Sequence, residues 1–198
     1  MNPRTMTALD PRSSLVLDTK EVGRRPGSMV ELTRTIEAPA DFGTVVLAVP
    51  QGEPLRVDVR LESVVEGVLV SGSVRAIGTG MCVRCLDPVA VEIDVTFQEL
   101  YGYTDRLAHH ASVGDEEAEE ELRVEDGLID LEPALRDAVV PALPFQPVCA
   151  PSCPGLCSQC GVRLVDDPGH HHDVIDPRWS ALTALAVSSD TAHRKDED

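Results

Sequence analysis

Four of the six cysteines of this chain lie in the stretch Cys149-Ala-Pro-Ser-Cys153-Pro-Gly-Leu-Cys157-Ser-Gln-Cys160-Gly161. Their pattern is C-x3-C-x3-C-x2-C, and the other two form an earlier pair, Cys82-Val-Arg-Cys85. Core cysteines that only pack are scattered through apolar runs. Pairs spaced by two or three residues in loops with Gly and Pro suit a tetrahedral zinc ion, because each short arch brings two sulfurs to one metal. The sequence therefore predicts structural Zn²⁺, with candidate ligands Cys82, Cys85, Cys149, Cys153, Cys157 and Cys160.

Two ligand sets are compatible with this spacing. In the first, Cys149, Cys153, Cys157 and Cys160 form a self-contained site and the earlier pair stands apart. In the second, the earlier pair joins two of the later four, and Cys157 and Cys160 are favoured because they complete the common C-x2-C…C-x2-C pattern. The run His170-His-His172 has two interpretations, a source of one further zinc ligand or an exposed polar turn.

The composition limits the class of protein. The chain has 198 residues, no apolar run of the length that a membrane span needs, about 18–20 residues, and no apolar signal-peptide segment between Met1 and Lys20. We therefore expect a cytoplasmic protein, in which thiols stay reduced and clustered cysteines more often hold metal than form disulfides.

The charge balance is strongly acidic, with 34 acidic residues against 17 basic ones and a formal net charge of −17. Nonspecific affinity for nucleic acid rests on Lys and Arg, so this balance argues against a surface that follows phosphates and suits a basic partner. Asp115–Asp126 holds eight acids with only Arg123 in opposition. We interpret this run as part of an acidic linker over 105–127, and as an electrostatic lure for a basic protein in the functional alternative.

The region 30–100 has the pattern of antiparallel strands that are open to water on one face. Apolar residues recur at every second position, which places them on one side of a strand. The alternating segments are Leu55–Glu62, Val68–Val74 and Val91–Gln98. Gly72 lies in line with the apolar residues and is interpreted as a weak point or bulge. Thr44–Val49 is predicted to be a further short strand.

The pair Cys82 and Cys85 lies between two of these predicted strands, in a segment rich in Gly and closed by Pro88. We therefore expect it at the tip of a hairpin. That position suits a zinc-binding knuckle. It does not suit a thioredoxin-type redox pair, whose first cysteine needs a helix N-terminus to lower its pKa.

Two helices are predicted in the second half of the chain. The first covers 130–143, with Asp130 or Glu132 as its cap and Pro133 in the first turn, and it ends at Pro141 and Pro144. The second covers 176–187, where Asp176 precedes a proline at the first helical position.

The predicted fold class is α+β, with an antiparallel β-rich body, a few short helices and a Cys-rich zinc-binding loop near the C-terminus. The expected parts are a flexible N-terminal segment 1–29, one domain over 30–187 that contains the zinc loop 149–161, and a disordered tail 188–198.

Several segments occur together in a specific order. They are Cys82-Val-Arg-Cys85-Leu86, Ile129-Asp-Leu-Glu-Pro133, an apolar helix ending Ala-Leu-Pro144, Cys153-Pro-Gly-Leu-Cys157-Ser-Gln-Cys160-Gly161, and Asp176-Pro-Arg-Trp-Ser-Ala-Leu182. With them the chain resembles the large ribosomal RNA subunit accumulation protein family (YceD-like) over residues 30–187. Members of this family differ in how many cysteines the second cluster keeps, and His170–His172 is not part of the family pattern.

The resemblance implies a non-enzymatic role in the accumulation of 23S rRNA and the assembly of the large ribosomal subunit. It implies partners among the components of that subunit, including a small zinc-containing ribosomal protein. Direct contact with rRNA would come from the Arg-bearing N-terminal segment or from the knuckle around Arg84.

Two other functions were considered. A thiol-redox or metal-handling protein would use the same Cys pairs, and fast thiol reactivity would distinguish it from a structural zinc protein. A hydrolase or transferase has no support, because the sequence shows no phosphate-cradling Gly loop, no nucleophile motif and no three-ligand metal site beside a carboxylate base. We therefore expect a protein that is not an enzyme.

Overall fold

The computed structural model describes residues 9–104, 122–172 and 178. The chain divides into two compact units, Met1–Cys153 and Pro154–Asp198. The helix predicted over 176–187, the tail 188–198 and residues 115–121 of the acidic run lie outside the described residues. Within those described ranges, every helix is too short or too polar to cross a bilayer.

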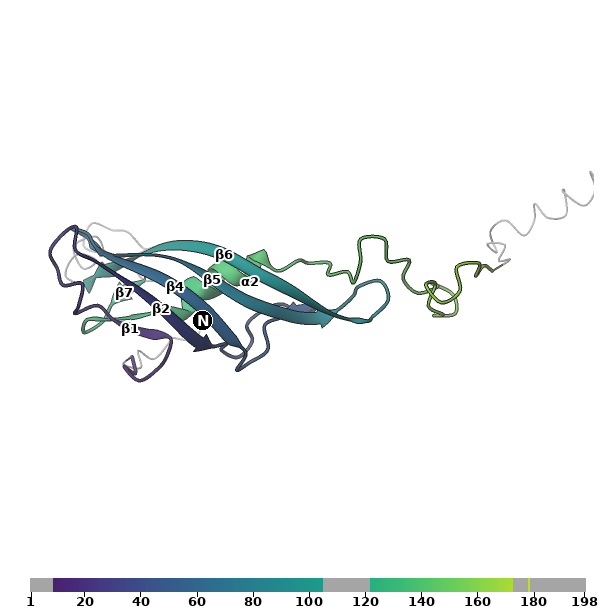
Figure 1. Ribbon diagram of the computed structural model, residues 1–198, viewed down its shortest axis with the longest axis horizontal. Coiled ribbons are helices and arrows are strands. Elements are labelled where there is room, and N and C mark those ends of the chain that lie inside the picture. The colour runs from purple at the N-terminus through teal and green to yellow at the C-terminus, as the bar shows by residue number, and fades with distance from the viewer. Residues whose placement is uncertain (1–8, 105–121, 173–177, 179–198) are drawn as a thin grey trace, which may run out of the picture. The chain divides into compact units, whose positions relative to one another are not determined.

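The first unit is built on a six-stranded sheet with the order β2-β4-β5-β6-β7, and β3 pairs with β5 beside this path (Figure 1). Neighbouring strands are antiparallel, except β6 and β7, which are parallel. The strands are β2 (Met29–Glu37), β3 (Leu47–Ala48), β4 (Pro54–Ser63), β5 (Gly67–Met81), β6 (Pro88–Tyr103) and β7 (Arg123–Val124). The three long strands β4, β5 and β6 confirm the alternating pattern of the sequence, because their apolar positions face the core.

Two strand predictions needed correction. The strand predicted over Thr44–Val49 is only Leu47–Ala48, because Thr44 and Leu47 close a tight turn in which the Thr44 N–H donates to the Leu47 carbonyl at 2.8 Å. Gly72 is not a bulge, because its register is unbroken between Val59 on β4 and Phe97 on β6. A Cβ at Gly72 would lie 2.5 Å from the Asp58 carbonyl oxygen and 3.1 Å from the Phe97 ring, so glycine is the residue that lets these neighbours close in.

Helix α2 (Glu132–Ala142) lies across one face of the sheet and contacts β6 (Figure 1). Its buried residues are Ala134, Leu135 and Val139. They complete a core whose strand side includes Val57, Leu61, Val70 and Val74, each fully buried. Burying one such aliphatic side chain stabilises a fold by about 1.5–3 kcal/mol. The sequence predicts one apolar stripe at helical spacing, formed by Leu131, Leu135, Ala138, Val139 and Ala142. Leu135 and Val139 at its centre are buried, whereas Ala142, at the helix end, is exposed.

The ends of α2 follow the predicted signals with two differences. The N-cap is Leu131, which makes no side-chain capping hydrogen bond, so the cap predicted at Asp130 or Glu132 was wrong. The Asp130 Oδ1, one residue before the N-cap, accepts a hydrogen bond from the Glu132 N–H at 2.9 Å. Glu132 is not the cap but the first helical residue, and its carboxylate pairs with Arg136 at 2.7 Å. Pro141 lies inside the last turn, so the helix passes the first predicted stop by one residue.

A second, two-stranded sheet pairs β1 (Val16–Asp18) with β8 (Leu128–Asp130) just before the helix. The acidic segment expected as a linker over 105–127 has an ordered end, because β7 falls within it. Val124 is buried there and packs with the core, which an entirely acidic linker could not do.

Candidate metal centres

The turn between β5 and β6 places Cys82 and Cys85 at the tip of the hairpin, as the sequence predicted. The N–H of Cys82 donates to the Asp87 carbonyl at 2.7 Å, and the N–H of Leu86 donates to the Cys82 carbonyl at 2.9 Å. The N–H of Arg84 points at the Cys82 Sγ at 3.4 Å. Leu86 has a φ of 63°, in the left-handed region. We call residues 82–87 the hairpin knuckle.

The segment after α2 brings Cys149 and Cys153 to the same place. Arg84 holds this segment, because its Nη1 donates to the carbonyl oxygens of Pro151 at 3.3 Å and Cys153 at 3.0 Å. Arg84, in the knuckle considered from the sequence for RNA contact, thus binds the protein's own loop.

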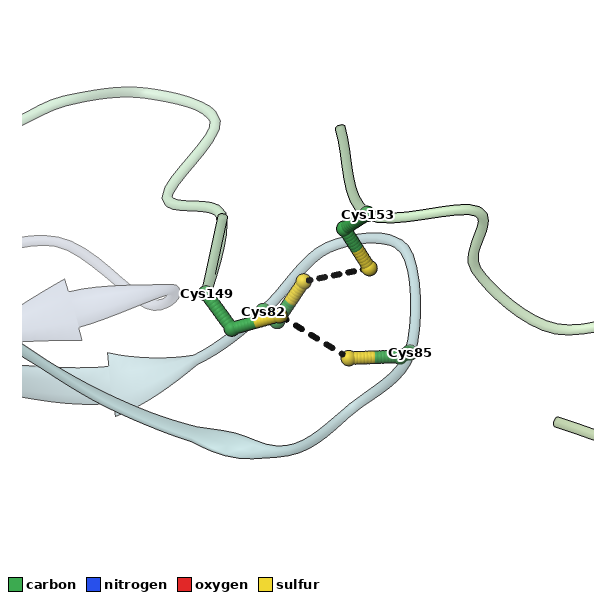
Figure 2. Close-up of side chains that lie close together, drawn as sticks. All are labelled: Cys82, Cys85, Cys149 and Cys153. Carbon is green, nitrogen blue, oxygen red and sulfur yellow. Dashed lines mark hydrogen bonds between the residues drawn. The ribbon is translucent and has the colours of Figure 1, made fainter. Parts of the chain in front are cut away.

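The four thiols of the first unit form one cluster (Figure 2). The Sγ atoms of Cys82 and Cys153 are 3.9 Å apart, those of Cys85 and Cys149 are 3.6 Å apart, and all four lie within 4.8 Å of one another. Two sulfurs on one tetrahedral zinc ion are about 3.8 Å apart, given Zn–S bonds of about 2.3 Å. Cys82, Cys85 and Cys153 are buried, and Cys149 is exposed. The cluster therefore fits a four-thiolate metal ion.

The local electrostatics favour ionisation of one thiol of this cluster. Burial opposes ionisation of Cys82, but the backbone N–H groups of Cys149, Cys85 and Arg84 outweigh it and lower the pKa of Cys82 to about 6. For Cys85, the backbone N–H of Asp87 lowers the pKa, but burial and the neighbouring sulfurs outweigh it and raise the pKa to about 12. Packed sulfurs resist a second negative charge, and a bound cation is what would relieve that repulsion.

The remaining two thiols lie in the second unit, in a different cluster. Cys157, Cys160, His170 and His172 have ligand atoms that all lie within 4.8 Å of one another. The backbone N–H groups of Cys160 and Gln159 lower the pKa of Cys157 to about 6. Among the described residues, these two clusters are the groups of metal-ligating side chains that converge in this way.

Residues 70–186 match the large ribosomal RNA subunit accumulation protein YceD family. The chain belongs to this family. It is also similar to proteins described as uncharacterized in mycobacteria. One, from Mycobacterium tuberculosis, is 49% identical over 180 residues, which cover 90% of this chain and 85% of the relative. Another, from Mycobacterium leprae, is 43% identical over 173 residues, which cover 87% of this chain and 78% of the relative. No solved structure showed significant similarity to the chain.

Both clusters fall within the part of the chain that matches the YceD family, but their grouping differs from both ligand sets considered from the sequence. Cys82 and Cys85 do join two of the later cysteines, as in the second set. The pair they join is Cys149 and Cys153, and not Cys157 and Cys160. The self-contained set of four later thiols is not formed. Cys149 and Cys153 belong to the first unit, and Cys157 and Cys160 belong to the second.

The sequence of this YceD family member left open whether the run His170–His172 supplies a zinc ligand. The structure places His170 and His172 in the second cluster. The C-x2-C pair at Cys157 and Cys160 has no second thiol pair left once Cys149 and Cys153 are used elsewhere. The sequence signal for these ligands was the spacing His170-x-His172 after the C-x2-C pair. Alternate residues of an extended segment lie on the same side, so both histidines can reach one ion if a turn brings the chain back to the cysteines.

Proposed function

We propose that this chain is a zinc-stabilised, non-enzymatic factor for assembly of the large ribosomal subunit and accumulation of 23S rRNA. The family match supports the biological context, since its description names large ribosomal RNA subunit accumulation. The observation that carries the structural part is the convergence of four thiols from two segments of the first unit.

In this proposal, zinc is a structural staple. Cys82 and Cys85 come from the hairpin knuckle, while Cys149 and Cys153 come from the loop that follows α2. One ion bound to all four would fix the loop to the sheet, in addition to the hydrogen bonds that Arg84 donates to the carbonyl oxygens of Pro151 and Cys153. Four protein ligands leave no open position on a tetrahedral ion, which is typical of structural and not catalytic zinc.

The partner in this proposal is basic. The net charge of −17 disfavours a large phosphate-binding surface and favours docking on a basic ribosomal protein, such as a small zinc-containing protein of the large subunit. Such docking would shield the basic protein from premature contact with 23S rRNA until its place in the particle is ready.

A thiol-redox or metal-handling function is the alternative, and the exposure of Cys149 favours it, because an exposed sulfur can exchange its metal or react. Alkylation of the purified chain before and after chelation separates the two. A structural site keeps Cys82, Cys85, Cys149 and Cys153 unreactive until zinc is removed. Rapid labelling of Cys149 in the zinc-bound protein would favour the alternative.

Depletion of this protein in its host tests the assembly role. The expected result is a lower ratio of large to small ribosomal subunits in sucrose gradients and a lower ratio of 23S to 16S rRNA, both restored by the wild-type chain. Restoration by a Cys85→Ser, Cys153→Ser double variant that no longer binds zinc at the four-thiolate cluster would contradict the structural role of that zinc. Unchanged subunit and rRNA ratios after depletion would contradict the assembly role itself.

A further inference from the structure

The cluster in the second unit has the contacts expected around one metal ion. The Cys160 Sγ lies 3.2 Å from the His170 Nε2 and 3.3 Å from the His172 Nε2, and the two Nε2 atoms are 2.8 Å apart. A hydrogen bond between the two imidazoles would account for the last distance alone. It would not bring the sulfur of Cys160 to both rings, nor the sulfur of Cys157 within 4.8 Å of all three atoms.

The turn that presents Cys157 and Cys160 repeats the backbone of the hairpin knuckle. The Cys157 N–H donates to the Val162 carbonyl at 2.8 Å, and the Gly161 N–H donates to the Cys157 carbonyl at 2.9 Å. The Gln159 N–H points at the Cys157 Sγ at 3.5 Å. In the hairpin knuckle the three corresponding distances are 2.7, 2.9 and 3.4 Å.

The conformation agrees as well as the hydrogen bonds. Gly161 has a φ of 73°, and Leu86, its counterpart in the hairpin knuckle, has a φ of 63°. Two segments with unrelated flanking structure thus form the same turn around a C-x2-C pair. In the first unit, the two thiols of that turn belong to a set of four converging ligand atoms. We expect the turn in the second unit to serve a four-ligand site as well.

His170 is oriented by a carboxylate behind it. Its Nδ1 lies 3.5 Å from the Asp167 Oδ2, while its Nε2 faces the cluster. A histidine that binds metal through one ring nitrogen usually donates from the other to a carboxylate or carbonyl, which fixes the ring and its tautomer. Asp167 occupies that outer position.

Within the described residues of the second unit, no apolar side chain is fully buried. Within residues 154–172, all of which the structure describes, the only buried residue is Gly155, and Val162 and Val165 are exposed. The segment nevertheless forms an ordered turn, a bridge between Leu156 and Arg163, and convergent ligands. Small units without an apolar core are generally folded by a metal ion or disulfides, and these thiols are not paired with each other.

We infer that the chain has a second metal site of the Cys₂His₂ type, in which Cys157, Cys160, His170 and His172 bind one zinc-class divalent ion and thereby fold residues 154–172. The site shares no ligand with the four-thiolate cluster. Thiolate and imidazole together select borderline-soft metals such as Zn²⁺ over Mg²⁺ or Ca²⁺. This inference does not depend on the assembly role.

Zinc stoichiometry of the purified full chain tests the site. The wild type is expected to bind two zinc ions per chain, and His170→Ala and His172→Ala one each. His171→Ala is the matched control, because its Nδ1 contacts the Gly169 carbonyl instead of the cluster, and it should still bind two. Cys85→Ser should bind one through the other cluster. One ion per wild-type chain, unchanged by His170→Ala, would overturn the inference, as would equal losses in His170→Ala and His171→Ala.

Alkylation mapped by mass spectrometry provides a readout that survives partial unfolding. In zinc-bound His170→Ala, Cys157 and Cys160 should be labelled many-fold faster than in wild type, while the four thiols of the first unit stay protected. Co²⁺ should give a wild-type spectrum that contains a four-thiolate component and a two-thiolate component, and His170→Ala should lose only the weaker one. Loss of protection at all six thiols in His170→Ala would contradict two separate sites.

Discussion

At the scale of single residues, the hairpin knuckle and the matching turn at residues 157–162, here called the second knuckle, have the same backbone conformation but place different residue types in it. The fourth position after the first cysteine needs a left-handed conformation, with a φ of 63° at Leu86 and 73° at Gly161. Glycine adopts it without steric cost, whereas an L-residue with a Cβ loses roughly 1–2 kcal/mol. The hairpin knuckle therefore contains strain that the rest of the first unit must balance, and the second knuckle does not.

Exchanging the residue type at this position should move stability in opposite directions. Leu86→Gly should stabilise the first unit by up to about 1 kcal/mol, since Leu86 is 56% exposed and few contacts are lost. Gly161→Ala should lower zinc affinity of the second cluster by roughly five- to thirtyfold, because the new Cβ meets no atom within 4 Å and only the backbone is strained. Urea unfolding and zinc competition measure these effects. A clear loss of stability in Leu86→Gly would contradict the strain.

At the scale of elements, the sheet and α2 form the part of the molecule that a core alone can hold. Strands β4, β5 and β6 pair without interruption, and the helix closes one face. The pairing is continuous because Gly72 lets Phe97 and the neighbouring strand approach. The weak point suggested by the sequence is thus a packing requirement.

A methyl group at Gly72 should disturb this packing. Gly72→Ala is expected to destabilise the first unit by about 1–3 kcal/mol, because its Cβ would lie 2.5 Å from a backbone oxygen that can move only with its strand. Ser73→Ala, at the next residue on β5, is the matched control and should change stability by less than about 0.5 kcal/mol. Urea denaturation measures both. Equal stability of Gly72→Ala and wild type would show that the two strands can separate without cost.

At the scale of the whole molecule, the two units depend on metal to different extents. The first has an extended apolar core, while residues 154–172 have none. Removal of metal should therefore unfold residues 154–172 more readily than the first unit.

Chelation of the purified protein is expected to leave the far-UV signal of the sheet in place and lower its melting temperature. Hydrogen exchange at residues 154–172 should rise toward that of an unfolded chain, and exchange at β4, β5 and β6 should change little. Adding Zn²⁺ back should restore both. Global loss of β structure on chelation would mean that the core is not self-sufficient.

The charge of the molecule gives a prediction for binding. With a net charge of −17, association with a basic component of the large subunit should weaken steeply as salt rises, mainly through a slower on-rate. Binding to purified large-subunit proteins across a salt series measures this effect. Affinity that is independent of salt would indicate an apolar interface instead.

Much of the fold could be predicted from the sequence because its signals are local. Alternation at Leu55–Glu62 and Val91–Gln98 specifies strands with one buried face, and the apolar stripe of α2 specifies a helix. The hairpin tip at Cys82 follows from the strands on either side of it. The family resemblance, now confirmed, rests on the order of such local pieces.

The sequence alone also determined that six thiols in short-spaced pairs form candidate metal ligands. Which thiols meet was decided by tertiary structure, because ligand sets join residues far apart in the chain. Spacing within a pair is a local property, and it cannot say that Cys82 lies beside Cys153 or that His170 faces Cys160. Helix α2 and the β5–β6 hairpin bring Cys82 and Cys153 together, and the turn before His170 brings His170 to Cys160.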